Sequence, residues 1–152
     1  MPTRANGGRP LPAADVPAVQ VVDTNIVVNL LMQGPYSEPA RALHARDRDW
    51  QSEPLLLIEL TNVLATVVRK LAYTLDDATA ILHNAQRIMA PGLRRVADHD
   101  VLNAASHFGV TGYDARFLVV ARAIGTRLVT EDAKLRRAAP DLTCSLAEAL
   151  AR

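Results

Sequence analysis

The sequence is poor in several features that would define a class of protein at once. Its single cysteine, Cys144, excludes an internal disulfide and a zinc site built on several cysteines. We expect Cys144 to be a small buried or half-buried apolar residue. Aromatic residues make up only 4% of the chain, so a base-stacking platform for single-stranded nucleic acid is not expected. No apolar run approaches the roughly 18 residues of a membrane helix.

The N-terminal segment also lacks the apolar stretch of a secretory signal. Without an export signal or a membrane helix, the prediction is a cytoplasmic protein with no membrane partner. Residues 1–18 are rich in Pro and Gly, which predicts a flexible leader. Residues 19–152 are long enough for one domain with a sizeable core, and 49% hydrophobic against 22% charged residues is ordinary for such a domain.

Short apolar runs alternate with longer helical segments from residue 19 to the C-terminus. Ser37 and Asp98 are predicted N-caps, and capping boxes are predicted from Thr74 and Ser145. No β-hairpin signal is present, so the pattern predicts an α/β fold with a mostly parallel sheet covered by helices on both faces. The strands are expected at 19–23, 50–52, 94–97, 127–130 and 143–144, and the helices at 37–48, 54–71, 74–89, 98–108, 114–124, from 132 and from 145.

Four carboxylates stand beside core-forming segments, where an acid is costly to bury. Asp23 ends an apolar run, Glu59 interrupts one, Asp114 precedes one and Asp132 follows one. Acids are seldom buried unless they are paired or hold a metal. The four residues therefore predict one shared cation site.

These acids have reason to converge. Asp23 and Asp132 follow predicted strands, and sites of open α/β sheets form at the carboxyl ends of strands. Glu59 shares a helical stripe with Leu55 and Val63, so it should point inward from an apolar face. Carboxylate oxygens suit Mg²⁺, which can activate water and polarise a phosphate. Helix capping is the competing explanation for Asp23, Asp114 and Asp132, and it is weakest for Glu59.

The positive charges favour a phosphodiester substrate. The chain has 17 basic and 16 acidic residues, and without the four acids 12 acidic residues remain, so the basic residues are in excess by five. A basic rim around a metal-filled acidic pit would hold a nucleic-acid backbone. Arg116 and Lys134, each two residues beyond a site acid, are candidates to touch phosphate, and an exposed helix face is the alternative for both.

Four segments resemble the successive motifs of PIN-domain nucleases, most closely the VapC-type toxins of type II (VapBC) toxin–antitoxin pairs. The segments are 21–25 (VVDTN), 54–64 (PLLLIELTNVL), 113–115 (YDA) and 128–135 (LVTEDAKL). The resemblance covers residue 19 to the C-terminus. It implies a three-layer α/β/α sandwich and a Mg²⁺- or Mn²⁺-dependent endoribonuclease acting on tRNA or rRNA. It also implies a homodimer that a cognate antitoxin inhibits.

The resemblance places the acidic quartet of the family on Asp23, Glu59, Asp114 and Asp132 as catalytic and metal-binding residues. Asp23 and Asp114 are expected to hold the metal most directly, with Glu59 and Asp132 completing the cage, positioning water or acting as general base. Thr130 matches a hydroxyl position beside the site.

Three other functions are open on the sequence. A housekeeping PIN nuclease in RNA processing would have the same motifs as a toxin. A catalytically silent PIN-like module would have lost quartet acids, and all four are present. A phosphatase or phosphotransferase with Asp23 as nucleophile would, in haloacid-dehalogenase-like enzymes, need a second Asp two residues later, where this chain has Asn25.

Overall fold

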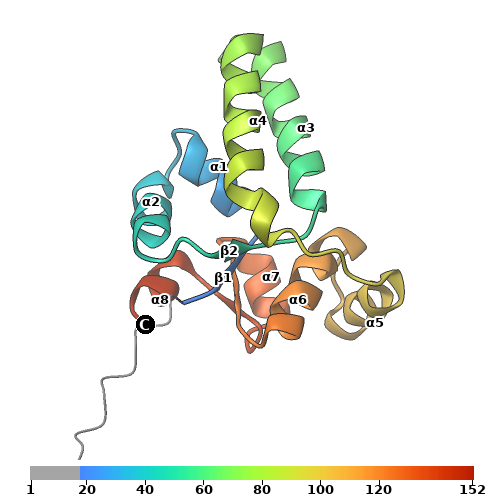
Figure 1. The fold of residues 1–152 in the computed structure, drawn as a ribbon. Helices are drawn as coiled ribbons and strands as arrows, with labels where there is room; N and C mark the ends of the chain where they lie inside the picture. Colours follow the sequence, from blue (N-terminus) through green and yellow to red (C-terminus); the bar gives the residue numbers. More distant parts are fainter. Residues whose placement is uncertain (1–17) are drawn as a thin grey trace, which may run out of the picture.

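The computed structural model describes residues 18–152 (Figure 1). The predicted leader, residues 1–18, lies outside the described part except for its last residue. Four parallel strands form one sheet in the order β2-β1-β3-β4. They are β1 (Gln20–Val22), β2 (Trp50–Gln51), β3 (Leu128–Val129) and β4 (Thr143–Cys144). The predicted parallel sheet is confirmed, and every strand residue is buried, as expected when helices cover both faces.

Helices occupy both sides of the sheet and complete a three-layer α/β/α fold. Figure 1 shows α1, α3 and α4 on one side and α6 and α7 on the other. The helices are α1 (Thr24–Leu31), α2 (Ser37–Arg46), α3 (Leu55–Arg69), α4 (Leu75–Met89), α5 (Asp98–Phe108), α6 (Gly112–Ile124), α7 (Ala133–Ala138) and α8 (Leu146–Leu150), with a 3₁₀ turn, η1 (Ala90–Gly92). Across the described residues, no helix is both long and apolar enough to cross a membrane.

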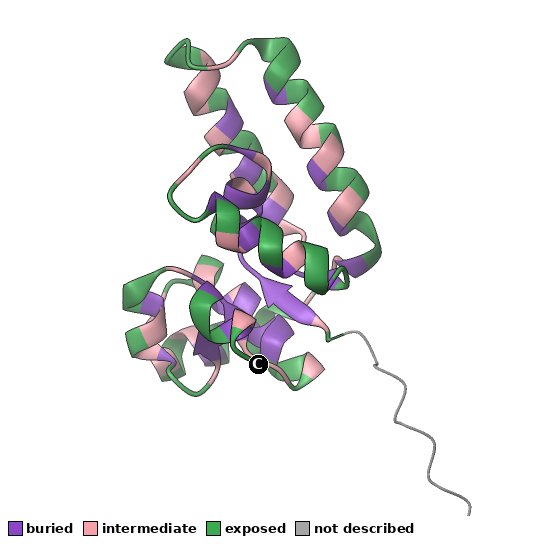
Figure 2. Cartoon of the chain, turned by 90° about the vertical axis from the view of Figure 1, so that its left-hand side faces the viewer, coloured by how far each residue is buried: buried purple, intermediate pink, exposed green. Residues whose placement is uncertain are grey.

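The core surrounds the sheet and the inner faces of its helices, while the far ends of α3 and α4 are largely exposed (Figure 2). Val21 and Val22 of β1 and Leu128 and Val129 of β3 have no exposed surface. Cys144 is buried in β4, as predicted. The apolar runs found in the sequence therefore become the centre of the molecule.

One predicted strand is wrong. Residues 94–97 form no strand; the only pairing here is a single bridge between Ser52 and Leu93, with the Arg94 N–H donating to the Ser52 carbonyl at 2.7 Å. The neighbouring strand β2 has only two residues, and Ser52 and Glu53 alone separate it from Pro54, where the turn into α3 begins. Within residues 18–152, the pairing of this segment therefore ends at Ser52.

Two predicted N-caps are also wrong by one position, whereas both predicted capping boxes are present. Ser37 and Asp98 are the first residues of α2 and α5 and do not cap them. The Ser37 hydroxyl instead donates to the Met32 carbonyl at 2.7 Å, and the Asp98 carboxylate pairs with Arg116 at 2.6 Å. The Ser37 side chain therefore belongs to the turn between α1 and α2, and the Asp98 side chain to an ion pair with α6.

Candidate active site

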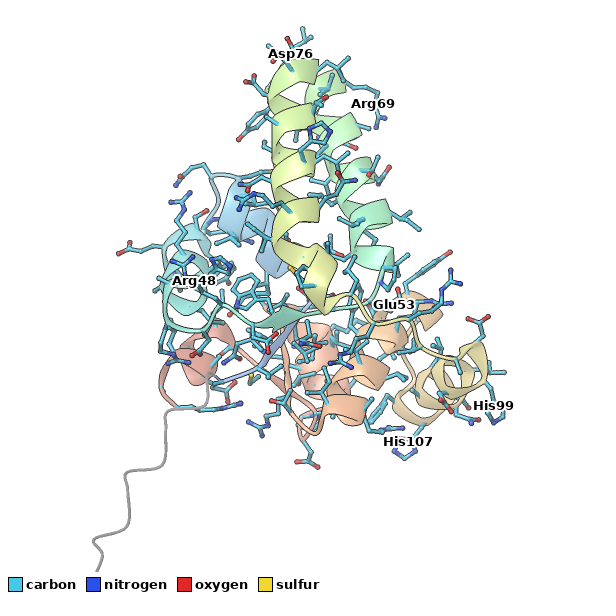
Figure 3. The ribbon with its side chains drawn as sticks, viewed as in Figure 1. Arg48, Glu53, Arg69, Asp76, His99 and His107 are labelled. Carbon is cyan, nitrogen blue, oxygen red and sulfur yellow. The ribbon has the colours of Figure 1, made fainter. Side chains whose placement is uncertain are left out.

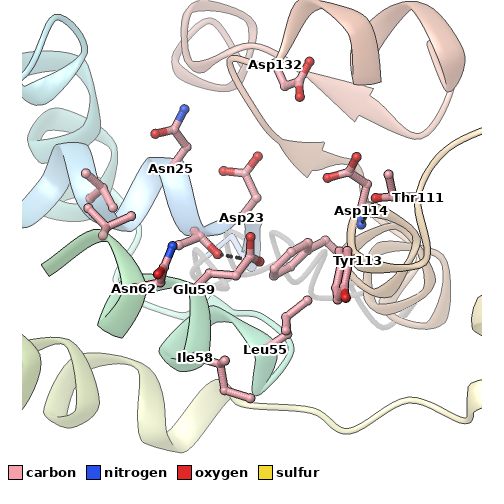
Figure 4. A pocket seen from close by; sticks show the side chains of 14 residues that line it. Asp23, Asn25, Leu55, Ile58, Glu59, Asn62, Thr111, Tyr113, Asp114 and Asp132 are labelled. Carbon is pink, nitrogen blue, oxygen red and sulfur yellow. Dashed lines mark hydrogen bonds between the residues drawn. The ribbon is translucent and has the colours of Figure 1, made fainter. Parts of the chain in front are cut away.

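One pocket, with a volume of about 570 Å³, is lined by all four predicted acids (Figure 4). Asp23 follows β1, Glu59 lies on α3, Asp114 lies on α6 and Asp132 follows β3. The pocket therefore sits at the carboxyl end of the sheet, where parallel strands of an α/β fold place their sites. None of the residues that line it is Lys, Arg or His.

Asp23 is the most buried of the four, with 8% of its surface exposed. It caps α1, since its Oδ1 accepts a hydrogen bond from the Ile26 N–H at 3.1 Å. Burial raises the pKa of Asp23 from 3.8 to about 6, and the negative charges of Glu59 and Asp132 raise it further, while hydrogen bonds from Thr130 and Ile26 oppose the shift. An acid held in this way would gain from a nearby cation.

Glu59 points into the pocket from the inward stripe of α3, as its spacing predicted. Leu55, Glu59 and Val63 all line the pocket. The Thr24 hydroxyl donates to Glu59 Oε1 at 3.1 Å, the bond drawn in Figure 4. Burial raises the pKa of Glu59, the Thr24 hydrogen bond lowers it, and the charge of Asp114 raises it. The second oxygen, Oε2, forms no hydrogen bond within the described residues, which leaves it available to a ligand.

Asp114 does not cap its helix, so the capping explanation is wrong for this residue. Thr111 is the N-cap of α6, and its hydroxyl accepts from the Asp114 N–H at 3.1 Å. The Asp114 carboxylate is half-buried and forms no ion pair with any residue of the described chain. Its place in the pocket is therefore not required by the local structure.

Asp132 is an N-cap as well as a pocket residue. Its Oδ1 accepts from the N–H groups of Lys134 at 2.9 Å and Leu135 at 3.1 Å, at the start of α7. Thr130 is fully buried beside it, and its hydroxyl accepts from the Asp132 N–H at 3.1 Å. The Thr130 side chain also lowers the pKa of Asp23, so it acts on two of the four acids.

The two basic candidates lie beside the pocket and not in it. Arg116 donates to Glu53 at 3.0 Å and to Asp98 at 2.6 Å, so its guanidinium is occupied by two carboxylates. Lys134 lines a neighbouring hollow together with Asp114 and Asp132. Contact of either residue with a substrate stays a prediction.

The donor set fits a hard divalent cation. Four carboxylates face one pocket whose lining carries no positive charge, an arrangement that a cation would neutralise. Among residues 18–152, no three Asp, Glu, His or Cys side chains are grouped tightly enough to enclose an ion by themselves. Mg²⁺ suits such a loose set, because it binds through one or two carboxylates and keeps several of its waters.

The sequence pattern did not identify several residues at the edge of the pocket. Ile58 and Tyr113 line it from α3 and α6, and Thr111 and Asn25 complete parts of its wall. Ile58 directly precedes Glu59, and Tyr113 directly precedes Asp114, so adjacency to the acids was the available signal.

A small parallel α/β sandwich with an acidic pocket at the carboxyl end of its sheet defines the class of this protein. The family model of the PIN domain matches residues 21–140, and the chain belongs to that family. No curated protein matches the chain.

Two solved structures support the fold. PAE2754 from Pyrobaculum aerophilum is similar over 89% of this chain and 100% of its own, with a TM-score of 0.62 and 21% identity. FitAcB from Neisseria gonorrhoeae is similar over 84% of this chain and 96% of its own, with a TM-score of 0.57 and 15% identity. At these identities the likeness concerns the fold alone.

Proposed function

We propose that this protein is a divalent-metal-dependent endoribonuclease, using Mg²⁺ or Mn²⁺, and the toxin component of a toxin–antitoxin pair. One observation carries the proposal: four carboxylates from four separate elements line a single pocket that no basic side chain neutralises. Membership of the PIN family supports a nuclease as the class of enzyme.

In this proposal Asp23 and Asp114 hold the cation most directly. A bound divalent ion would lower the pKa of water and offset the charge of the scissile phosphate. Oδ1 of Asp23 accepts a hydrogen bond from the Ile26 N–H at 3.1 Å, which orients the carboxylate before any ligand binds. The Asp114 carboxylate forms no hydrogen bond or ion pair with residues 18–152, which suits a ligand that must adjust to the ion.

Glu59 is the candidate for the general base. Its pKa is raised above that of an exposed glutamate and so lies closer to neutral pH. A general base transfers a proton most effectively when its pKa is near the working pH. Thr24 occupies Oε1 and orients the carboxylate, so Oε2 is the oxygen that would take the proton. Asp132 would keep its cap through Oδ1 and offer Oδ2 to the site.

The proposed partners follow from family membership: an RNA substrate, with tRNA or rRNA as first candidates, a cognate antitoxin and a second copy of the chain, all in the cytoplasm. A housekeeping PIN nuclease would use the same pocket. A silent binding module is disfavoured, because the quartet is complete and assembled in one pocket.

The test is cleavage of total RNA with Mg²⁺, with EDTA, and with the variant Asp114→Asn. Asp100→Asn is the matched control, since Asp100 is an exposed helical acid outside the pocket. Wild type and Asp100→Asn should cut in Mg²⁺, and neither EDTA-treated protein nor Asp114→Asn should. Equal cleavage in every sample would remove the proposed mechanism. A toxin should in addition arrest growth of a bacterial host when expressed, and Asp114→Asn should not.

A further inference from the structure

The acidic pocket continues into a second hollow between α3 and α6. The two share the residues Leu55, Ile58 and Tyr113 in their walls. The second hollow also contains Arg116 with the two carboxylates that pair with it, Glu53 and Asp98, and beside them the exposed Arg95. A ligand in the acidic pocket could therefore extend over the shared wall toward a positive charge.

On its other side the acidic pocket continues into a third hollow. Here the shared residues are Thr111, Asp114 and Asp132, and the added charge is the exposed Lys134. The acids thus occupy the centre, and one exposed cation lies beyond each end. A chain with a negative charge at regular intervals matches this pattern, with one phosphate at the metal site and a phosphate on each side of it.

The shared wall on the Arg95 side is apolar and unusually exposed. Ile58 is 67% exposed and Tyr113 is 68% exposed, and they come from different helices. Figure 4 shows Leu55 and Ile58 across the pocket from Asp132, with Tyr113 beside Asp114. The scarcity of aromatic residues excluded a broad stacking platform, but one exposed ring at this position is enough for a single base.

We propose that Tyr113 and Ile58 form a base-binding subsite for the nucleotide next to the scissile phosphate. The base stacks on the Tyr113 ring and packs against Ile58, and the following phosphate lies toward Arg95. This inference rests on the proposed ribonuclease function and adds the residues that hold the base. A base in a duplex has both faces covered by its neighbours, so the subsite requires an unstacked, unpaired nucleotide.

The decisive experiment compares cleavage kinetics of a short unstructured RNA that contains a site found in total RNA. Wild type, Tyr113→Phe, Tyr113→Ala and Ile58→Ala are measured with the control Leu102→Ala, which removes an equally exposed apolar side chain on α5 (69%). Tyr113→Phe and Leu102→Ala should behave as wild type. Tyr113→Ala should lower kcat/KM by about 5- to 150-fold, the range expected from stacking of one base. Circular dichroism should show every variant folded, because these side chains are largely exposed.

A second measurement tests whether the base is the part of the RNA that contacts Tyr113. An RNA with an abasic nucleotide beside the cleavage site should lower kcat/KM for wild type as much as Tyr113→Ala does. The two changes together should cost no more than either alone, because they remove the same contact. Arg95→Ala should reduce the salt dependence of substrate binding, whereas Arg69→Ala, at the far end of α3 from Glu53 (Figure 3), should not.

The outcomes separate the two proposals. If wild type cleaves the RNA and Tyr113→Ala cleaves it equally well, the subsite is refuted and the nuclease stands. Equal cleavage of the same RNA within a duplex also refutes the subsite. If Tyr113→Ala changes only the sedimentation of the protein, the apolar wall is a contact with a second copy and the subsite is refuted. If folded wild type cleaves no RNA in Mg²⁺, the nuclease proposal fails and the subsite fails with it.

Discussion

Replacing Asp23 with Asn should stabilise the metal-free protein and abolish its activity. The carboxylate of Asp23 is buried next to two other acids and has no cationic partner in the described chain, so its charge opposes folding. Asn is as good an N-cap as Asp, so the hydrogen bond from the Ile26 N–H can be kept. The substitution removes the unfavourable charge and leaves the local structure in place.

The magnitude follows from the pKa of Asp23, which burial raises from 3.8 to about 6. A shift of this size corresponds to roughly 3 kcal/mol, at about 1.4 kcal/mol per pKa unit. Because the folded-state pKa is raised, the protonated form is the one that folding favours. The penalty is therefore absent below pH 3.8, grows as the pH rises, and is complete above a pH of about 6.

Thermal unfolding in EDTA, measured from acid to neutral pH, tests this reasoning. In a domain of this size 1 kcal/mol moves Tm by about 2–4 °C, so Asp23→Asn should raise Tm by roughly 6–12 °C at neutral pH and by little at about pH 4. Asp132→Asn, the replacement of an exposed capping acid, is the control and should change Tm little. Mg²⁺ should raise the Tm of wild type more than that of Asp23→Asn, since ligand binding to the folded state stabilises it. A less stable Asp23→Asn at neutral pH, or a difference independent of pH, would refute the argument.

Three further substitutions test the bonds around the site. Thr24→Val removes the hydrogen bond that lowers the pKa of Glu59, so the acidic limb of the plot of kcat/KM against pH should move to higher pH. If the limb does not move, a group other than Glu59 titrates there. Asp132→Ala should lower the free energy of unfolding by about 1 kcal/mol through the lost cap, whereas Asp132→Asn keeps the cap. Both variants should lose activity. Full activity in Asp132→Asn would exclude a metal-binding role for this residue. Arg116→Met leaves the buried Glu53 carboxylate without its ion-pair partner. The free energy of unfolding, measured in urea, should fall by about 2 kcal/mol, less than the roughly 3–5 kcal/mol lost when a fully buried pair is broken.

The fold could be predicted because its signals are local. The strands expected at 19–23, 127–130 and 143–144 are found as β1, β3 and β4, and the capping boxes at Thr74 and Ser145 lie where helices begin. The strand expected at 94–97 failed because pairing depends on the length of its neighbour β2, which these residues do not encode. Local pattern identified which residues were able to form a strand, and the partner strand decided whether they did.

The convergence of the four acids on one pocket could be predicted from the sequence, and the ion pairs beside that pocket could not. Glu53 and Arg116 are 63 positions apart in the sequence, and neither carries a local mark of the pairing. Arg116 seemed available to a substrate because it follows Asp114 by two residues, yet its guanidinium is bound by Glu53 and Asp98. A side chain in a helix is equally compatible with solvent, substrate or a distant acid, and only the tertiary structure distinguishes these.

Helix capping separates the three site aspartates in a way that matters for experiment. Asp23 and Asp132 each accept backbone hydrogen bonds at a helix start, so replacement by a residue that cannot cap, such as Ala, changes both the local structure and the charge of the pocket. Asp114 has the same signature in the sequence, but Thr111 does the capping in its place. Its carboxylate forms no ion pair in the described chain and contributes charge to the pocket alone. Loss of activity in Asp114→Asn, with an unchanged Tm, would therefore be attributable to the chemistry of the site and not to the stability of the fold.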